Sequence, residues 1–517
     1  MIIMKKKMNV LFIITDQFRA DHLGCYGNPM IKTPNLDKLA SEGVRFTNAF
    51  CTNPMCMPNR STFLTGLYPN VHGVRSNGIN LPTDLATITE SLYKRGYHTI
   101  NVGKPHFNFW LPPYKLLPKS SESFEGWLAD KAGDNPVKEN FPIPYYGFRE
   151  VEMIAGHGNL CLGHYLDDWL DERAPELAKR VRDIFHVDTF FALFCDSFIP
   201  EEHYNTKYVE ERTIAFLERY SKGEYGKKPF FLHCSFPDPH HPVCPPGKYR
   251  DMYNPDDIEL PKSFDNIKNL YDHPFLGPHL KQPIFRGALL RESTEEEVRK
   301  FTALNYGSET CIDHSIGQIL ASLEQLGLAE NTMVIFTSDH GDFMGDHGML
   351  LKGPAPFNGV LQVPLIWKVP GLTQSGTTDA LVSTVDLPKT ILTLLGLKER
   401  QQPPNMQGYD MTPVLKEPDN PDKQVRDCCL IVHDEEVGPK GPLYARLLHY
   451  ITKTHKLTIY EGVKGYGDLF DRINDPDELN NLWFDENTKD LKHELIEDLL
   501  HEDLKIQSRM PERQSGT

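Results

Sequence analysis

Two short runs of hydrophobic residues predict buried strands. Asn9–Thr15 (NVLFIIT) and Thr332–Thr337 (TMVIFT) are almost continuously apolar and rich in β-branched residues. Runs of this length without a polar face are typical of parallel strands that are buried on both sides. An aspartate follows each run within two residues, at Asp16 and at Asp339. Because the carboxyl ends of parallel strands meet at one edge of a sheet, we expect these two aspartates to lie close together.

Helical patterns lie between and after these strands. Thr33–Gly43 (TPNLDKLASEG) starts with a Thr-Pro cap and first turn and stops at glycine, and Ser308–Gly327 continues a helical spacing. Strands that alternate with helices predict an α/β fold, a large α/β/α sandwich with a mostly parallel central sheet. The segment from about Phe107 to Gly226 has weaker periodicity and many aromatic residues, and we interpret it as insertions around the site.

A change in composition predicts a domain boundary near residue 420. Residues 399–426 are polar and rich in proline, which is typical of a linker. Beyond them, residues 447–462 (LLHYITKTHKLTIYEG) alternate as strands do, and residues 491–504 (LKHELIEDLLHEDL) have the pattern of an amphipathic helix. We therefore expect a large domain over residues 1–420 and a small α+β domain with an antiparallel sheet over residues 421–517.

Composition excludes several classes of protein. Hydrophobic residues make up 39 % of the 517 residues, and 37 glycines add to that share. This is the composition of a globular chain and excludes a disordered or fibrous one. The formal charge of −16 provides no overall positive field, so we expect neither nucleic acid nor an anionic membrane as a partner. An anionic substrate would need a local cationic pocket.

The N-terminal segment, the length of the apolar stretches and the cysteines indicate the cellular compartment of the protein. A basic cluster precedes the run Val10–Ile14, but this run is short and Asp16 closes it, which favours a core strand over a signal peptide. No stretch approaches the roughly 20 apolar residues that cross a bilayer, and we expect a cytoplasmic protein. The ten cysteines lie far apart except for Cys428 and Cys429, which favours mostly free, buried thiols.

Cys56 is the most distinctive local feature, in the segment CMPNRSTFLTGLYP. Pro58 suits the first turn of a helix, and Arg60 follows four residues after the cysteine. A helix N-terminus and a neighbouring arginine both lower the pKa of a thiol, which would make Cys56 a nucleophile or a site of oxidation. A structural thiol is the alternative, and both remain open from these residues alone.

Two clusters at predicted strand ends offer metal ligands. Asp16-Gln17 and Asp339-His340 supply two carboxylates, an amide oxygen and an imidazole. A hard divalent cation prefers such oxygen ligands, with one nitrogen tolerated. Carboxylates at strand ends also cap helices, so a metal site and a pair of caps are both compatible with the pattern.

A third group consists of cations and imidazoles in loops punctuated by glycine and proline. They are Lys104 and His106 in VGKPHF, His240 and His241 in FPDPHHPVCPP, and Lys352 in MLLKGP. An oxyanion needs several such donors, whereas each residue alone is equally well explained as a solvated lysine or a structural histidine. Their common setting in loops favours a binding site.

Together these motifs resemble the sulfatase family of the alkaline phosphatase superfamily. The family signature CxPxR, followed by LTG, is present as Cys56, Pro58, Arg60, Leu64, Thr65 and Gly66. The similarity also covers NVLFIITDQFRADHLGCYG, TPNLDKLASEGVRFTNAF, GKPHF, PHHP, TSDHGDFMGDHG, KGP and LFDRINDPDELNNLW. It spans most of the chain and thins between about residues 110 and 225.

The resemblance implies a modified nucleophile and a metal. Cys56 would be converted to formylglycine by a formylglycine-generating enzyme that recognises CxPxR on the nascent chain. Asp16, Gln17, Asp339 and His340, with residue 56, would bind one divalent metal. Calcium is the first expectation, and magnesium and manganese are alternatives because an oxygen-rich set does not choose between them.

The implied reaction is hydrolysis of a sulfate ester through a covalent sulfo-enzyme intermediate. The aldehyde hydrate would attack sulfur, with Asp339 as the proton acceptor. His240, with Lys352, would protonate the leaving oxygen, and His106 would take the proton of the remaining hydroxyl so that sulfate leaves. The substrate would be a small-molecule or saccharide sulfate ester, and the resemblance leaves room for a homo-oligomer.

Further residues of the resemblance would bind the substrate and the hydrate. Arg60 and Lys104 would hold the hydrate and neutralise charge that develops on the sulfate oxygens. Lys104 would bind the substrate together with His106, His240 and Lys352. Asn77 in RSNG falls where phosphonate monoester hydrolases of this superfamily have a substrate-binding asparagine.

Departures from the commonest sulfatase pattern keep an alternative open. Gln17 and His340 stand where many sulfatases have Asp and Asn, a combination similar to that of phosphonate monoester hydrolases and choline sulfatases. The alternative is therefore a phosphonate monoester hydrolase or phosphodiesterase with the same formylglycine. Lys104 and His106 keep the GKxH pair of sulfatases and favour sulfate esters. A relative that only binds anions, without formylglycine, is a third hypothesis.

Overall fold

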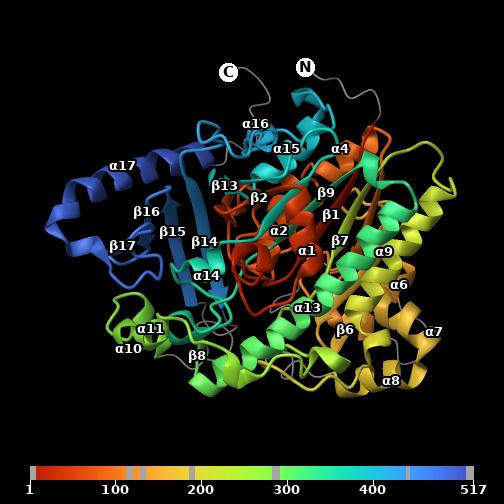
Figure 1. Cartoon of the computed structure of the whole chain (residues 1–517), viewed down its shortest axis with the longest axis horizontal. Helices are drawn as coiled ribbons and strands as arrows, with labels where there is room; N and C mark the ends of the chain where they lie inside the picture. The colour runs from red at the N-terminus through yellow and green to blue at the C-terminus, as the bar shows by residue number, and fades with distance from the viewer. Residues whose placement is uncertain are drawn as a thin grey trace.

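The computed structural model describes residues 7–111, 120–128, 136–185, 192–281, 291–437 and 443–507. A nine-stranded sheet forms its centre (Figure 1). The strand order is β12 (Gly376–Thr378), β2 (Val44–Phe46), β11 (Leu365–Lys368), β9 (Thr332–Ser338), β1 (Asn9–Thr15), β7 (Phe230–Ser235), β4 (His98–Gly103), β5 (Glu150–His157) and β6 (Leu160–Gly163). The five strands from β9 to β5 pair in parallel, whereas β11 and β6 are antiparallel to their neighbours. The prediction of a mostly parallel sheet is confirmed.

β1 lies at the middle of this sheet and is buried on both faces. Its bounds are those predicted from the hydrophobic run, and all seven residues are buried. In register, Ile13 lies beside Cys234 of β7 on one side and Phe336 of β9 on the other. Because alternate side chains of a strand point to opposite faces, β1 contributes to two separate hydrophobic cores.

Helices cover both faces of the sheet and complete the predicted α/β/α sandwich. On one face, Leu11 and Ile13 of β1 share a core with residues of three helices. These helices are α1 (Pro34–Glu42), α9 (Asn205–Ser221) and α13 (Glu295–Gln325). On the other face, Val10, Phe12 and Ile14 pack against a second group. It comprises α2 (Cys56–Thr65), α4 (Ile88–Lys94), α15 (Asp386–Leu394) and α16 (Thr412–Lys416).

Two regions differ from the sequence interpretation. The helix predicted over Ser308–Gly327 begins earlier, at Glu295, behind a capping box formed by Thr294 and Glu297. The segment interpreted as insertions contributes β5 and β6 to the sheet, in addition to short helices. Those helices are α5 (Phe124–Leu128), α6 (Pro136–Glu139), a π-helix (Tyr165–Leu170), α7 (Asp171–Arg173) and α8 (Pro175–Ile184).

The C-terminal region forms the predicted antiparallel sheet with a helix on one face. Its strands, in order, are β14 (Cys429–Val437), β15 (Leu443–Ile451), β16 (His455–Tyr460) and β17 (Gly467–Asp471), and the helix is α17 (Lys489–Ile506). Figure 1 shows this unit in blue at one side of the molecule. Leu430 and Val432 of β14 pack with Leu495 of α17. The opposite face, which includes Ile431, packs against Phe343 and its neighbours in the large domain.

Backbone hydrogen bonds join this small sheet to the segment that precedes α2. The amide of Val432 donates to the carbonyl of Thr52 at 2.9 Å, and Asn53 Nδ2 donates to the carbonyl of Val432 at 2.9 Å. β14 therefore lies directly beside the loop that leads into Cys56.

The cysteines follow the prediction in part. Eight are free, and seven of these are buried. Cys195 and Cys244 instead form a disulfide, which links the segment before α9 to the loop that follows β7. Among the described residues, every helix is too short or too polar to cross a membrane.

Candidate active site

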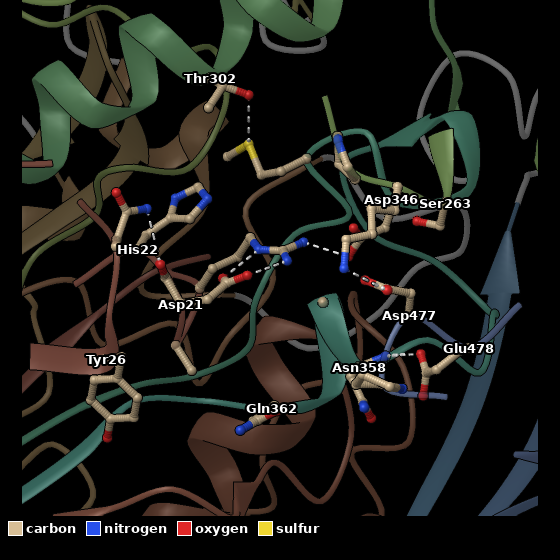
Figure 2. A pocket seen from close by; sticks show the side chains of 18 of the residues that line it. Asp21, His22, Tyr26, Ser263, Thr302, Asp346, Asn358, Gln362, Asp477 and Glu478 are labelled. Atoms are coloured by element: carbon tan, nitrogen blue, oxygen red, sulfur yellow. Dashed lines mark hydrogen bonds and ion pairs between the residues drawn. The ribbon is translucent and has the colours of Figure 1, made fainter. Parts of the chain in front are cut away.

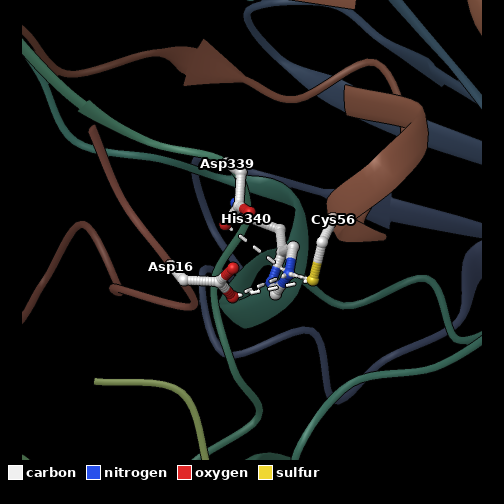
Figure 3. Close-up of side chains that lie close together, drawn as sticks. All are labelled: Asp16, Cys56, Asp339 and His340. Atoms are coloured by element: carbon white, nitrogen blue, oxygen red, sulfur yellow. Dashed lines mark hydrogen bonds and ion pairs between the residues drawn. The ribbon is translucent and has the colours of Figure 1, made fainter. Parts of the chain in front are cut away.

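The predicted ligands converge at the carboxyl edge of β1 and β9 (Figure 3). His340 Nε2 lies 3.7 Å from Asp16 Oδ1 and 3.6 Å from Asp339 Oδ1. Cys56 Sγ lies 3.2 Å from His340 Nε2 and 3.6 Å from Asp16 Oδ1. All four side chains are buried. The expected proximity of the two aspartates is confirmed, and neither of them caps a helix.

Gln17 is held in a left-handed backbone conformation beside these ligands. Its φ is 64°, which is uncommon for a residue other than glycine and is a feature of functional sites. Its amide N–H donates to Asp339 Oδ1 at 3.1 Å, and its side-chain Nε2 donates to Asp342 Oδ2 at 2.5 Å. The remaining amide oxygen, Oε1, is buried and accepts no hydrogen bond.

These donor atoms fit a hard divalent cation. His340 Nδ1 lies 2.8 Å from the carbonyl of Gly341, which can only accept, so Nδ1 carries the proton and Nε2 presents a lone pair. Gln17 Oε1, which has no hydrogen-bond partner, is a second lone-pair donor, and Asp16 Oδ1 is a third. Two carboxylates, an amide oxygen and one imidazole form the mixture that calcium, magnesium and manganese accept.

Arg60 joins the two aspartates. Its Nε donates to Asp339 Oδ2 at 2.7 Å, and its Nη2 donates to Asp16 Oδ2 at 3.1 Å. Nη1 donates to the carbonyl of Lys104 at 3.0 Å and to Ser235 Oγ at 2.9 Å. The side chain is only 1 % exposed, and each of its three nitrogens donates to a protein oxygen. Arg60 thus orients the two carboxylates beside Cys56.

Cys56 is the first residue of α2, as the sequence predicts. Lys352 Nζ donates to its Sγ at 2.9 Å. Burial and the carboxylate of Asp16 nevertheless raise the pKa of the thiol above its usual value, against the opposing effect of the lysines. The hypothesis that a helix N-terminus and Arg60 lower this pKa is wrong, because burial of the thiol and the carboxylates of Asp16 and Asp339 outweigh the neighbouring cations. An unmodified Cys56 is a poor nucleophile.

Lys104 and His106 follow β4 and line the same site. Lys104 is fully buried and forms an ion pair with Asp16. Burial opposes ionisation of Asp16, but Lys104, His240 and Arg60 outweigh it and hold its pKa well below the usual value. The His106 ring stacks on Trp110 with centroids 3.8 Å apart, and its φ of 58° is left-handed. Burial and the charges of Lys104 and Arg60 hold the pKa of His106 well below its usual value, so this imidazole is neutral.

Lys352 and His240 form a second hydrogen-bonded pair. Lys352 Nζ lies 3.0 Å from His240 Nε2 and 2.9 Å from His340 Nε2. His240 Nδ1 lies 2.6 Å from the carbonyl of His241 and must carry the proton of that ring, which leaves Nε2 to accept from the lysine. Burial, His157 and Lys352 hold the pKa of His240 well below its usual value. The ammonium of Lys352 is therefore the proton-bearing member of the pair.

The rings of His157 and His241 both stack on the ring of His240, and the sequence analysis did not predict this stack. His157, at the end of β5, stacks on His240 with ring centroids 3.7 Å apart, and His241 stacks on the other side at 4.1 Å. Lys104 Nζ donates to His157 Nε2 at 2.8 Å. The position of His157 at the carboxyl end of a sheet strand, between glycines in AGHGN, is the feature that could have identified it.

Two asparagines support the start of α2. Asn77 Oδ1 accepts from the amide of Met57 at 3.0 Å, and the side chain is partly exposed. Asn59, which stands where sulfatases commonly have serine, donates to the carbonyl of Asp339 and accepts from Thr52 and Thr384. It thereby ties the cysteine-bearing helix to the end of β9.

A cleft of about 670 Å³ opens elsewhere on this edge (Figure 2). Its walls include Asp21, His22, Asp346, Asn358 and Glu478, and Arg19 joins two of its carboxylates. None of the predicted site residues is among the described residues that line it. The cleft and the cysteine cluster are therefore separate features.

Comparisons with known proteins show the family of this chain. A family model described as sulfatase matches residues 8–397, and a model for the C-terminal region of N-sulphoglucosamine sulphohydrolase matches residues 345–505. An ulvan-active sulfatase of Formosa agariphila is 28 % identical over 496 residues, which are 95 % of this chain and 80 % of that protein. An arylsulfatase of Clostridium perfringens is 29 % identical over 493 residues, 94 % of this chain and 92 % of that one.

The fold is also similar to that of a solved structure. The phosphonate monoester hydrolase of Agrobacterium radiobacter superposes with a TM-score of 0.76 at 24 % identity, over 96 % of each chain. The sulfatase model alone covers more than half of the present sequence. The chain therefore belongs to the sulfatase family of the alkaline phosphatase superfamily and is a hydrolase of sulfuric esters.

Proposed function

We propose that this enzyme hydrolyses aryl or saccharide sulfate esters with a formylglycine derived from Cys56. The observation that carries the proposal is the environment of Cys56 Sγ, which lies within 3.6 Å of Asp16, His340 and Lys352 in a buried cluster. The raised pKa of the thiol argues against a thiolate nucleophile. A formylglycine supplies a hydrated aldehyde at the same point, and CxPxR is the recognition sequence for a formylglycine-generating enzyme acting on the nascent chain.

We further propose that Asp16, Gln17, Asp339 and His340 hold one divalent cation next to residue 56, with calcium as the first candidate. The unpartnered Oε1 of Gln17 supports this assignment, as does the lone pair that His340 Nε2 presents to the cluster. Such a cation supplies Lewis-acid charge that stabilises negative charge at residue 56 and on the sulfate. The oxygen-rich donor set also admits magnesium and manganese.

Proton transfer to the leaving oxygen falls to Lys352 and His240. Lys352 contacts both Cys56 Sγ and His240 Nε2, so its ammonium can reach an ester bound at residue 56. His240 is neutral, and its Nε2 accepts from the lysine while its Nδ1 remains anchored to a carbonyl, so it can orient the ammonium that donates the proton. Poor leaving groups depend on this step, because an alkoxide is too basic to depart unprotonated.

His106 and Lys104 act in the second step, in which sulfate leaves residue 56. His106 is a neutral imidazole, and its Nδ1 is buried without a hydrogen-bond partner, so it can take the proton whose loss from residue 56 expels sulfate. Lys104 offsets the charge of Asp16 and points its ammonium into the cluster. Arg60 orients the two aspartates before the substrate binds, so these carboxylates need not move during the reaction.

Hydrolysis of phosphonate monoesters or phosphodiesters is the second candidate function. The Gln17 and His340 pair favours it, as does Asn77, whose amide group lies at the start of α2 beside Met57. Lys104 and His106 favour sulfate, because the GKxH pair is the sulfatase pattern. The ratio of kcat/KM for 4-nitrophenyl sulfate to that for a 4-nitrophenyl phosphonate monoester decides between them, and we expect it to exceed one.

Replacing the proposed nucleophile tests the assignment directly. Cys56→Ala is expected to lower kcat for 4-nitrophenyl sulfate by at least about 1,000-fold, because no nucleophile remains. Cys51→Ala is the matched control, since Cys51 is also buried but lies outside the cluster, and it should retain turnover. Normal turnover by the Cys56→Ala protein would contradict the mechanism.

Removing one carboxylate charge tests the metal site. Asp339→Asn is expected to lower the affinity for the divalent cation at least about 100-fold and to lower kcat with it, because a charged ligand is lost. Elemental analysis of the purified protein measures bound metal independently of activity. Asp196→Asn on the exposed surface should leave both quantities unchanged. Full metal content in Asp339→Asn would remove this residue from the ligand set.

The role of His240 predicts a dependence on the leaving group. His240→Ala is expected to lower kcat/KM for an alkyl sulfate about 100-fold or more, but that for 4-nitrophenyl sulfate by less than about 10-fold. Nitrophenolate is a good leaving group and needs no proton donor. Equal losses on the two esters would show that His240 is not part of the proton path.

A further inference from the structure

Three consecutive residues of β14 are acidic, and the first and third share one cationic partner. Asp434 accepts from Arg75 Nη1 at 2.9 Å, and Glu436 pairs with Nη2 of the same arginine. Successive side chains of a strand point to opposite faces, so Glu435 points away from Arg75. Of these three carboxyl groups, Glu435 is the one without a cationic partner.

The carboxyl group of Glu435 is buried, and only one of its two oxygens has a hydrogen-bond partner. Glu435 is 4 % exposed. Its Oε1 accepts from Ser76 Oγ at 3.0 Å, whereas Oε2 is buried and has no hydrogen-bond partner. Burial raises the pKa of Glu435 to about 8, against the opposing effects of the Ser76 hydrogen bond and Lys352. A buried polar atom without a partner costs free energy, which a bound ligand with a matching group would recover.

Glu435 lies on the side of β14 that faces the cysteine cluster. Ser76, its hydrogen-bond partner, precedes Asn77, whose side chain accepts from the amide of Met57 next to Cys56. The charges of Lys352 and Cys56 are close enough to act on the Glu435 carboxyl. His433, two residues earlier on the same face, is fully buried and neither of its ring nitrogens has a hydrogen-bond partner.

The chemistry of this group selects a hydroxyl. An uncharged carboxyl group can donate one hydrogen bond and accept another, which matches the two capacities of an alcohol hydroxyl. A substrate ammonium would be repelled by Lys352, and a further anion would have to be buried near the carboxylates of the cluster. Because Lys352 is assigned to the leaving oxygen, a group that reaches Glu435 stands on the alcohol part of the ester, close to that oxygen.

We propose that Glu435 is a specificity-determining residue that binds a hydroxyl group on the carbon adjacent to the sulfated one. The inference rests on the proposed function, since it concerns the alcohol part of a sulfate ester bound at residue 56. It assigns to the C-terminal sheet a part in substrate selection. Esters of vicinal diols, which include most saccharide sulfates, are the substrate class that it favours.

Two chromogenic esters isolate this contact. 4-Nitrocatechol sulfate carries a hydroxyl ortho to the ester, and 4-nitrophenyl sulfate lacks it. Both are assayed at a pH below the pKa of this nitrophenolic hydroxyl, so that the hydroxyl is uncharged. The quantity measured is the ratio of kcat/KM for the nitrocatechol ester to kcat/KM for the nitrophenyl ester. Both values are determined with the same variant, so a general loss of activity cancels in the ratio. Glu435→Leu and Glu435→Ala are both expected to lower this ratio about 10-fold or more, because the bound hydroxyl loses its partner. Glu435→Gln keeps a donor and an acceptor and should retain most of the ratio.

Glu436→Gln is the matched control, because it neutralises the neighbouring carboxylate on the opposite face of the strand. It should leave the ratio unchanged. If Glu435→Leu and Glu435→Ala lower kcat/KM equally for both esters, the residue is structural and the proposal is overturned. An unchanged ratio in these two variants overturns it as well.

A binding measurement distinguishes failure of this inference from failure of the proposed function. Calorimetry of the two esters with Cys56→Ala gives the ratio of Kd values without turnover. If Cys56→Ala binds the nitrocatechol ester more tightly than the nitrophenyl ester, and Cys56→Ala/Glu435→Leu binds the two equally, the subsite is supported. This holds even if the parent enzyme prefers phosphonates. Equal Kd values for the two esters before and after the Glu435 change contradict the subsite and leave the sulfatase assignment intact.

Discussion

The rest of the site depends on the guanidinium of Arg60, which bridges two buried carboxylates. Asp16 and Asp339 end adjacent parallel strands, so the sheet itself brings two negative charges together in a dry environment. Arg60 donates to both, and Lys104 offsets the remaining charge on Asp16. Breaking a buried pair of this kind typically costs about 3–5 kcal/mol. The arginine also anchors α2, and through it Cys56, to the ends of both strands.

Around this bridge the protein keeps its imidazoles neutral and its lysines charged. Burial and neighbouring cations lower the pKa values of His106 and His240, whereas Lys352, despite its burial, is held protonated by the carboxylates of Asp16 and Asp339. Neutral histidines can accept protons, and a charged lysine can donate one. The C-terminal sheet closes the site from the other side, where β14 adds the uncharged carboxyl group of Glu435. In the proposed mechanism the large sheet supplies the reacting groups, and in the proposed subsite the small sheet selects the alcohol part of the ester.

Part of this arrangement follows from the sequence and part does not. The hydrophobic runs that end near Asp16 and Asp339 predict the strands and the meeting of the aspartates, because parallel topology fixes which strand ends coincide. The pKa of Cys56 could not be predicted in the same way. It depends on the burial of the thiol and on the carboxylates and lysines around it, which are properties of tertiary packing. His157 and Glu435 were missed for the same reason, since stacking on His240 and the lack of a cationic partner appear only once β5 and β14 are in place.

The central claim is that residue 56 is a formylglycine in the active enzyme, and mass spectrometry of the peptide that contains it is the most direct test. The measurement is made on a preparation that is also assayed with 4-nitrophenyl sulfate, after co-expression with a formylglycine-generating enzyme. The account predicts a peptide in which an aldehyde replaces the thiol, with turnover that rises in proportion to the modified fraction. Full turnover by a preparation in which residue 56 is entirely unmodified cysteine would contradict it.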